Sequence, residues 1–236
     1  MSKIAAIIPA GGSGVRMEQK TAKPYLFLDS IPIIVHTLRV FEESPLIDAI
    51  LLVVQNNDIT LAYNEILIPF GFTKVTDVIP GGEMRQDSIY NALPFLTNDH
   101  SLIVVHDGVR PLVEHHILEQ TIETAQHTGA AIAGVPVKDT CKTIGTDFFV
   151  QQTINRHNMY QIQTPQVFKK EILLTAYREA HKDGFYGTDD ASLVERIGLP
   201  VKVVNGSYEN IKITTPDDLF QAELIVKKRK SQRIGL

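Results

Sequence analysis

The chain has 236 residues, of which 44% are hydrophobic and 21% charged. This composition is typical of a soluble globular protein and excludes collagen-like, coiled-coil and disordered classes. No apolar run approaches the roughly 18 residues that a membrane-spanning helix needs, so we predict no membrane partner and a cytoplasmic location. Cys141 is the only cysteine, which excludes an internal disulfide and a zinc site built from several cysteines.

The formal charge of -4 hides an uneven distribution. Five of the 23 basic residues lie in the last ten positions, at 227–230 and 233, and all 27 acidic residues precede them. The rest of the chain is therefore acidic, which argues against a nucleic-acid partner, because such partners bind to a basic face. An anionic substrate would need the few remaining cations gathered in one place. The basic tail is interpreted as the C-terminal end of a helix, where cations are favourable.

Short runs rich in Ile and Val alternate with longer segments of helical periodicity. In chain order they predict a strand at 4–9, a helix at 33–43, a strand at 50–54, a helix at 59–70, a strand at 75–79, a helix at 85–95, a strand at 102–105, a helix at 115–128, a strand at 130–135, helices at 170–182 and 191–197, a strand at 201–204 and a helix from Pro216. This alternation is typical of βαβ units. We therefore predict an α/β fold with a Rossmann-like, doubly wound, mainly parallel sheet in one domain that spans residues 1–236.

The segment 138–163 departs from this alternation. Polar and apolar residues alternate from Thr140 to Ile144 and again from Phe148 to Ile154, with a Gly-Thr-Asp turn between them. The pattern predicts a β-hairpin, and no helix-like segment is available to cover it. Because an isolated hairpin is only marginally stable, we expect this β-arm to pack on a second subunit.

A glycine-rich turn follows the first predicted strand. Residues 11–14, Gly-Gly-Ser-Gly, would let backbone N–H groups approach phosphate oxygens, because no Cβ blocks the glycines. The turn fails the dinucleotide fingerprint, which needs Gly or Ala where Met17 stands, and the P-loop pattern, which needs Gly where Gln19 stands. With Arg16 and Lys23 close behind, it predicts either a triphosphate cradle or an ordinary turn with two solvated cations.

Asp107 follows the predicted strand 102–105 in the run His106-Asp-Gly-Val-Arg-Pro111. In open α/β sheets the ligand crevice lies outside the carboxyl ends of the strands, where this carboxylate is expected. It is a candidate Mg²⁺ ligand, since magnesium is often held by one or two carboxylates and substrate phosphates. The alternative is a turn aspartate that caps local backbone.

A second glycine turn, Gly81-Gly82-Glu83, leads into Arg85 and Ser88. Two glycine turns at strand ends could flank one nucleotide, with the second contacting the base through backbone groups and Ser88. An ordinary loop is the alternative. No G-x-S-x-G or H-E-x-x-H motif is present, so an acyl-enzyme or a zinc hydrolase has no support.

Six motifs in order carry a resemblance to a known family. They are PAGGSGVRM at 9–17 with Lys23-Pro24, GGEMRQDS at 81–88, HDGVRP at 106–111, PVKDT at 136–140, QTPQ at 163–166 and NIKIT at 210–214. Together they resemble the 2-C-methyl-D-erythritol 4-phosphate cytidylyltransferases. The resemblance implies transfer of CMP from CTP to methylerythritol phosphate with release of pyrophosphate, in non-mevalonate isoprenoid precursor synthesis. It also implies dependence on Mg²⁺ and a homodimer that exchanges a β-arm.

Carried over position by position, the resemblance implies roles for individual residues. Catalytic roles fall to Arg16, Lys23, Arg156 and Lys212. Substrate contacts fall to Ala10, Gly11, Gly12, Gly82, Glu83, Arg85, Ser88, Asp107, Gly108, Arg110, Thr140 and Thr164. Asp107 would also bind Mg²⁺, and Glu209, which stands where the family has an aspartate, is a second candidate metal ligand. Thr140 and Arg156 would reach across the dimer into the other subunit's site.

Three alternatives remain. A ribitol-5-phosphate cytidylyltransferase would share the fold, CTP and the arm, although the runs 138–142 and 188–192 look more like the methylerythritol enzyme. A non-catalytic nucleotide-binding regulator would not need Arg16, Lys23 and Asp107. A nicotinamide-dependent dehydrogenase is disfavoured by the failed dinucleotide fingerprint.

Overall fold

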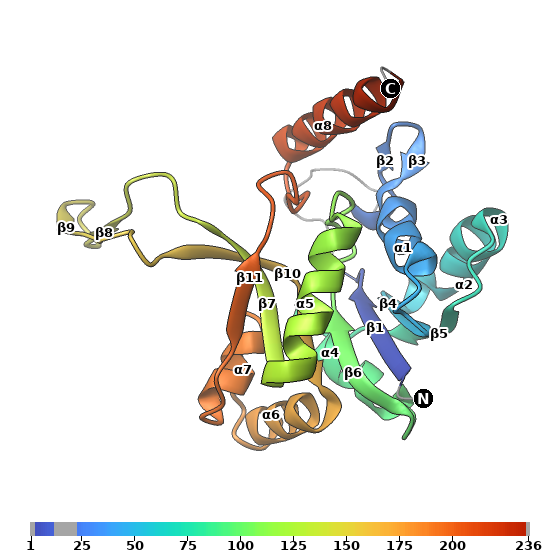
Figure 1. Cartoon of the computed structure of the whole chain (residues 1–236), viewed down its shortest axis with the longest axis horizontal. Helices are drawn as coiled ribbons and strands as arrows, with labels where there is room; N and C mark the ends of the chain where they lie inside the picture. The colour runs from blue at the N-terminus through green and yellow to red at the C-terminus, as the bar shows by residue number, and fades with distance from the viewer. Residues whose placement is uncertain (1–2, 12–22, 235–236) are drawn as a thin grey trace.

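A computed structural model describes residues 3–11 and 23–234, and its centre is a seven-stranded sheet (Figure 1). The strand order is β11-β7-β10-β6-β1-β4-β5. The strands are β1 (Lys3–Pro9), β4 (Ala49–Val54), β5 (Val75–Pro80), β6 (His100–Val105), β7 (Ala130–Pro136), β10 (Tyr160–Lys169) and β11 (Lys202–Asn205). Neighbouring strands are parallel except around β10, which is antiparallel to both β6 and β7. The predicted mainly parallel α/β sheet is confirmed.

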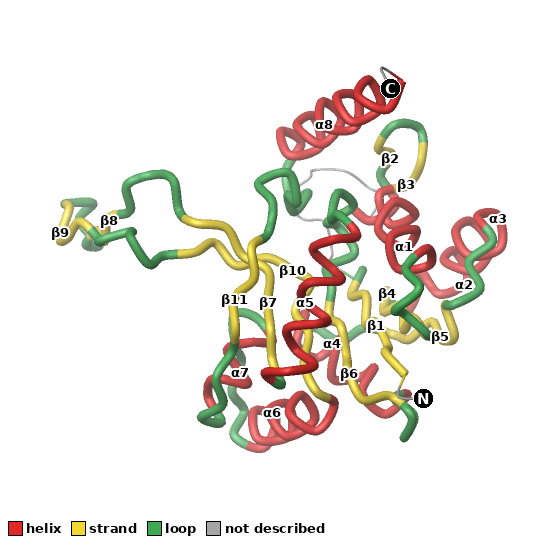
Figure 2. Tube along the Cα trace, viewed as in Figure 1, coloured by secondary structure: helices red, strands yellow, loops and turns green. Residues whose placement is uncertain are grey.

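Helices cover both faces of the sheet, as Figure 2 shows. They are α1 (Ile33–Glu43), α2 (Ile59–Leu61), α3 (Ile68–Phe70), α4 (Arg85–Ala92), α5 (His115–Thr128), α6 (Lys170–Lys182), α7 (Asp190–Arg196) and α8 (Pro216–Ile234). A π-helical segment at Ala62–Leu67 joins α2 to α3, so the predicted helix at 59–70 is helical throughout. The other predicted helices and strands are present, with ends that differ by at most a few residues.

Two apolar layers hold the helices against the sheet. Along β1, Ile4 and Ile8 point into the layer that includes α1 and α5, whereas Ala5 and Ile7 point into the layer that includes α4, α6 and α7. This alternation follows from the pleat of a strand buried on both faces, which is also why the sequence of β1 is apolar at almost every position.

The sequence prediction missed β10, the antiparallel strand between β6 and β7. Its sequence contains three glutamines and Pro165, which are unfavourable in a central strand. The pairing with β7 is interrupted between Ile162 and Gln166, next to the proline that lacks an N–H. The strand is nevertheless buried from Gln163 to Phe168 because two strands flank it. A short hairpin of β2 (Phe27–Leu28) and β3 (Ile31–Pro32) was also missed.

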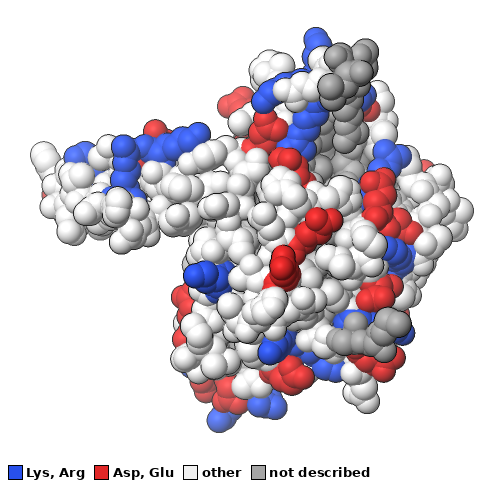
Figure 3. Space-filling model, viewed as in Figure 1, with Lys and Arg blue, Asp and Glu red and all other residues white. Residues whose placement is uncertain are grey.

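The predicted hairpin forms a separate two-stranded sheet of β8 (Lys142–Ile144) and β9 (Val150–Thr153), which are antiparallel. It lies at the tip of an arm that projects far from the sheet and continues from β7 and β10 (Figure 1). The side chains of Phe148 and Phe149 at the tip are 83% and 74% exposed. Figure 3 shows basic side chains along the same arm. The hairpin prediction is confirmed, and its packing on a second subunit stays a prediction.

Helix α8 closes a third apolar cluster with α1, the β2–β3 hairpin and the loop after β6. Its cations form ion pairs, as Lys228 and Arg229 bind Glu209, and Lys230 binds Asp29. Three basic residues of the tail therefore form ion pairs that attach the helix to the rest of the chain. No helix within residues 3–11 and 23–234 is long and apolar enough to cross a membrane.

We expect Phe41→Ala to lower the free energy of unfolding by about 3–5 kcal/mol, because the ring is fully buried and its removal leaves a cavity. Phe220 on α8 is 64% exposed, so Phe220→Ala should cost less than about 0.5 kcal/mol. Urea unfolding of both variants beside the unaltered chain measures the difference. Equal losses would contradict the assignment of Phe41 to the core.

Candidate active site

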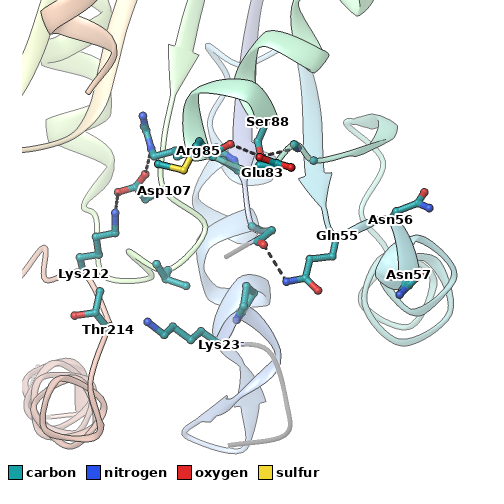
Figure 4. A pocket seen from close by; sticks show the side chains of 18 residues that line it. Lys23, Gln55, Asn56, Asn57, Glu83, Arg85, Ser88, Asp107, Lys212 and Thr214 are labelled. Atoms are coloured by element: carbon teal, nitrogen blue, oxygen red, sulfur yellow. Dashed lines mark hydrogen bonds and ion pairs between the residues drawn. The ribbon is translucent and has the colours of Figure 1, made fainter. Parts of the chain in front are cut away.

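A cavity of about 700 Å³ opens at the carboxyl ends of β1, β4, β5 and β6 (Figure 4). This is the edge at which open α/β sheets bind ligands. The lining residues come from the loops that follow these strands and from the segment before α8; they are Pro9, Ala10, Gly11, Lys23, Pro24, Gln55, Asn56, Asn57, Gly81, Gly82, Glu83, Met84, Arg85, Ser88, Asp107, Val109, Lys212 and Thr214. The topology thus brings six separate chain segments together around one cavity.

The second glycine turn is held tightly at the start of α4. Gly82 N–H donates to Ser88 Oγ at 3.1 Å, and Ser88 Oγ–H donates to the Met84 carbonyl at 3.1 Å. A Cβ at Gly82 would lie 2.3 Å from the Asp87 Cβ, so only glycine fits without moving the turn. The turn therefore presents a fixed backbone surface to the cavity.

On the first glycine turn, the structure describes Gly11 but not residues 12–22. The Gln55 amide, at the end of β4, donates to the Gly11 carbonyl at 3.1 Å (Figure 4). Lys23 begins a 3-10 turn (Lys23–Tyr25), and Figure 4 shows its side chain extending toward Thr214 and Lys212. Arg16 and Gly12 lie outside the described residues. The Gly11 backbone and the Lys23 ammonium thus line the same cavity.

Asp107, immediately beyond β6, is the centre of a cluster of opposite charges. Its Oδ1 accepts from Arg85 Nε at 2.8 Å, and its Oδ2 lies 2.9 Å from Lys212 Nζ and 3.6 Å from Arg110 Nε. Burial alone would raise the pKa of Asp107, but the three cations outweigh burial and hold this pKa well below its usual range. The carboxylate is therefore ionised at any physiological pH, with both oxygens already engaged by cations.

A chain of hydrogen bonds fixes this cluster from behind. Asp107 N–H donates to Thr164 Oγ1 at 3.1 Å, and the Thr164 carbonyl accepts from Asn210 Nδ2 at 2.9 Å. The Asn210 carbonyl in turn accepts from Arg110 Nη1 at 2.8 Å. Thr164 is on β10, so the strand that the sequence prediction missed is the one that supports Asp107.

His106 supports the same turn as a neutral side chain. Its Nε2–H donates to the Arg110 carbonyl at 3.1 Å, and its ring contacts Phe41, with ring centroids 5.0 Å apart. Burial is the main cause that lowers the pKa of His106 from 6.5 to about 4. The imidazole therefore stays uncharged near neutral pH and serves structure, since it does not line the cavity.

The structure brings most of the predicted site residues together, though not all of them. Ala10, Gly11, Lys23, Gly82, Glu83, Arg85, Ser88, Asp107 and Lys212 line the cavity. Gly108, Arg110 and Thr164 lie directly behind Asp107 or beside it in the chain. Thr140 and Arg156 are exposed on the arm, outside the cavity of their own chain.

Glu209 is placed differently from the prediction that it ligates a metal. Its carboxylate accepts from Lys228 Nζ at 2.7 Å and from Arg229 Nε at 3.0 Å, and it does not line the cavity. These ion pairs hold the pKa of Glu209 below its usual value. The residue attaches α8 to the preceding loop, and its role as a metal ligand stays a prediction.

The sequence prediction passed over Gln55, Asn56 and Asn57, which line the cavity. They follow an all-apolar strand, and polar residues at the carboxyl end of such a strand were a usable signal. It also passed over Asp190 as a site residue, although this buried acid accepts a hydrogen bond from Arg85. Nothing in the local sequence around Asp190 indicates that contact.

The depressed pKa of His106 predicts a loss of stability in acid. In the unfolded chain His106 takes up a proton near pH 6.5, whereas in the folded chain it does so only near pH 4. The neutral side chain therefore contributes its full stabilisation above pH 6.5, and this contribution is lost as the pH falls toward 4. Between pH 7 and 5 we expect His106 to account for about 2 kcal/mol of lost free energy of unfolding. Urea unfolding of wild type and His106→Gln at both values checks this. Parallel pH profiles would contradict it.

Comparison with known proteins identifies the family. The family model described as 2-C-methyl-D-erythritol 4-phosphate cytidylyltransferase matches residues 4–228. A relative of that name from Syntrophus aciditrophicus is 46% identical over 230 residues, which cover 98% of both chains. Another of that name, from Desulforamulus reducens, is 46% identical over 229 residues and covers 97% of this chain and 98% of its own.

Solved structures agree with this assignment. The crystal structure of 4-diphosphocytidyl-2C-methyl-D-erythritol synthase from Anaerococcus prevotii is 33% identical, with a TM-score of 0.84 over 96% of both chains. That of 2-C-methyl-D-erythritol 4-phosphate cytidylyltransferase from Thermus thermophilus is 27% identical, with a TM-score of 0.77 over 95% of this chain and 99% of its own. The chain therefore belongs to the 2-C-methyl-D-erythritol 4-phosphate cytidylyltransferase family and is a nucleotidyltransferase.

Proposed function

We propose that the chain transfers CMP from CTP to the phosphate of 2-C-methyl-D-erythritol 4-phosphate and releases pyrophosphate. The observation that carries this beyond family membership is the cavity itself, where a rigid glycine turn faces lysine side chains across a single space. A nucleotide has the matching two ends, a neutral base and a polyanionic tail. Its size also suits a cavity of about 700 Å³.

The cytidine would bind on the side of the second glycine turn. Gly82, Glu83 and Ser88 offer backbone and hydroxyl groups there, and Ala10 and Gly11 form the floor at the end of β1. A Cβ at Gly82 would meet Asp87 and displace the turn, so glycine at this position keeps the backbone groups in place. The base would thus be recognised largely by backbone groups held in place by Ser88.

The triphosphate and the acceptor phosphate would lie on the cationic side. Lys23 and Arg16 would bind the triphosphate, and Lys212, Arg110 and Thr164 the acceptor. The attacking phosphate monoester has a second pKa of about 6, so it is already largely ionised at neutral pH and needs no general base. The residues' task is then to align the two phosphates and to stabilise the charge that develops on the α-phosphoryl group and the leaving pyrophosphate.

The described residues offer no preformed site for a resident magnesium ion. Both oxygens of Asp107 are engaged by cations, and no cluster of three His, Cys, Asp or Glu side chains that could hold a metal exists in the described part of the chain. Magnesium would enter as part of the substrate, on the phosphates of CTP, as is common for this cation.

A homodimer would complete the acceptor side. The arm carries Thr140 and Arg156 away from the cavity of its own chain and leaves Phe148 and Phe149 exposed. Exposed aromatic residues on a thin hairpin are better explained by a partner than by solvent. In this arrangement the arm would deliver Thr140 and Arg156 to the other subunit's site. The cytoplasmic location expected from the sequence stays a prediction.

Lys23→Ala should lower kcat by about 100-fold or more while it changes CTP affinity only a few-fold, because the ammonium acts mainly on charge that develops in the transition state. The measurement is pyrophosphate release with CTP and methylerythritol phosphate, together with calorimetric binding of CTP. Lys230→Ala, a lysine of α8 outside the cavity, is the matched control and should match wild type.

The same assay separates the alternative acceptor. Release with ribitol 5-phosphate in place of methylerythritol phosphate would reassign the substrate, and release without any acceptor would point to hydrolysis. Equal losses of kcat and CTP affinity in Lys23→Ala would show that Lys23 acts only in ground-state binding of CTP.

Mixing two inactive variants tests the arm. A heterodimer of Arg156→Ala and Lys23→Ala chains contains one site with both residues intact if the arm crosses the dimer, so an equal mixture should regain about a quarter of wild-type activity. Lys23→Ala mixed with Lys212→Ala is the control, because both residues belong to one chain's cavity and no intact site can form. Activity of the first mixture no higher than the sum of its parents would contradict an exchanged arm.

A further inference from the structure

A second buried acid lies beside the cation cluster of the cavity. Asp190 begins α7, and the residue is 1% exposed. Its Oδ2 accepts from Arg85 Nη2 at 2.8 Å, and its Oδ1 accepts from the Tyr177 hydroxyl at 2.5 Å. The neighbouring Asp189 is the N-cap of α7, and its Oδ1 accepts from Ser192 N–H. Asp190 has no such local task.

The guanidinium of Arg85 joins this acid to Asp107. Its Nε donates to Asp107 and its Nη2 donates to Asp190, each at 2.8 Å. A guanidinium forms directional, charge-assisted bonds from a rigid plane, so two such bonds fix the orientation of that plane. Burial lowers the pKa of Arg85, but Asp190 first and Asp107 second outweigh burial and raise it well above its usual value. Arg85 thus stays protonated, and the two carboxylates compensate its positive charge.

This neutralisation has a consequence for phosphate binding. Arg85 lines the cavity with a side chain that is 28% exposed, and an unpaired guanidinium there would be a strong phosphate ligand. It would then draw the triphosphate or the acceptor toward α4 and leave Asp107 without its Oδ1 partner. With Asp190 in place, Nε and Nη2 of the guanidinium both already donate to carboxylates.

We propose that Asp190 is a positioning residue that holds Arg85 on Asp107 and away from the substrate phosphates. The effect of Asp190 on turnover rests on the proposed cytidylyl transfer. Arg85, which the sequence resemblance implied to contact substrate, acts in this view mainly by orienting Asp107. The Tyr177 hydroxyl completes the arrangement by occupying the other oxygen of Asp190, so that the carboxylate cannot rotate away.

The test removes the charge of Asp190 and keeps its shape. In Asp190→Asn the amide oxygen can still accept from Tyr177, but the ion pair with Arg85 is lost. We expect inorganic pyrophosphate, measured by calorimetry, to bind about tenfold more tightly, because a guanidinium becomes available to it. We expect kcat for pyrophosphate release to fall about tenfold, because the released guanidinium misplaces the reacting phosphates.

Two comparisons separate positioning from general damage. In an Arg85→Gln background, Asp190→Asn should change neither pyrophosphate affinity nor kcat further, since no guanidinium remains to be released. Asp189→Asn is the matched control: it removes the charge of the neighbouring acid and the oxygen that accepts from Gln166 Nε2, keeps an amide oxygen that can cap α7, and touches neither Arg85 nor Asp107. It should lower the melting temperature and leave pyrophosphate affinity unchanged. Tyr177→Phe should shift both readouts in the direction of Asp190→Asn, by less.

These measurements decide whether Asp190 positions Arg85. Weaker or unchanged pyrophosphate binding in Asp190→Asn would overturn the inference, as would an effect that persists when Arg85 is Gln. If Asp190→Asn does not fold, Tyr177→Phe takes its place, and unchanged pyrophosphate binding in that variant would overturn the inference equally. A wild-type chain that shows no turnover would overturn the proposed function alone, because the pyrophosphate binding measurements still decide the role of Asp190.

Discussion

A buried carboxylate with three cations around it is the constraint on which the site depends. An ionised aspartate inside a protein is costly unless its charge is compensated by partners in good geometry. Asp107 obtains them from Arg85 on α4, from Arg110 in its own turn and from Lys212 before α8. Each of these segments must therefore dock for the carboxylate to be tolerated, so the formation of the site and the formation of the fold are coupled.

The sheet topology extends that coupling to the arm. Strand β10 lies between β6 and β7 and supplies the Thr164 hydroxyl that binds the Asp107 N–H. The same strand and β7 continue outward into the arm, as Figure 1 shows. The arm is therefore joined directly to β10, the strand that supports Asp107. The antiparallel insertion in an otherwise parallel sheet makes this direct connection.

The chemistry suits a site that places charges and does not activate a nucleophile. Among the described residues that line the cavity there is no cysteine and no histidine, and the nearby His106 is held neutral and turned toward backbone. Ser88 uses its hydroxyl to close the glycine turn. Fixed cations and a rigid backbone surface are what a reaction between two phosphates requires, because electrostatic preorganisation supplies most of the stabilisation.

The sequence by itself determined the local elements and the residue types of the site. Helices 33–43, 115–128 and 170–182 match their predicted limits, because each buries one apolar stripe and this periodicity is written locally. The motifs also indicated most of the cavity, since side chains that follow parallel strands meet at one edge. Strand β10 escaped prediction because its glutamines and proline are unfavourable in a central strand, and only the tertiary structure places β6 and β7 on its two sides.

Only the tertiary structure decided how the charges pair. Arg85 meets Asp107 across 22 positions of the chain and Asp190 across 105, and no local pattern reports such a contact. Glu209 looked like a metal ligand by its place in a motif, yet it faces the cations of α8. Ion pairs form between whichever side chains the packed layers bring together. The sequence therefore determines which charges are present, and the topology determines their partners.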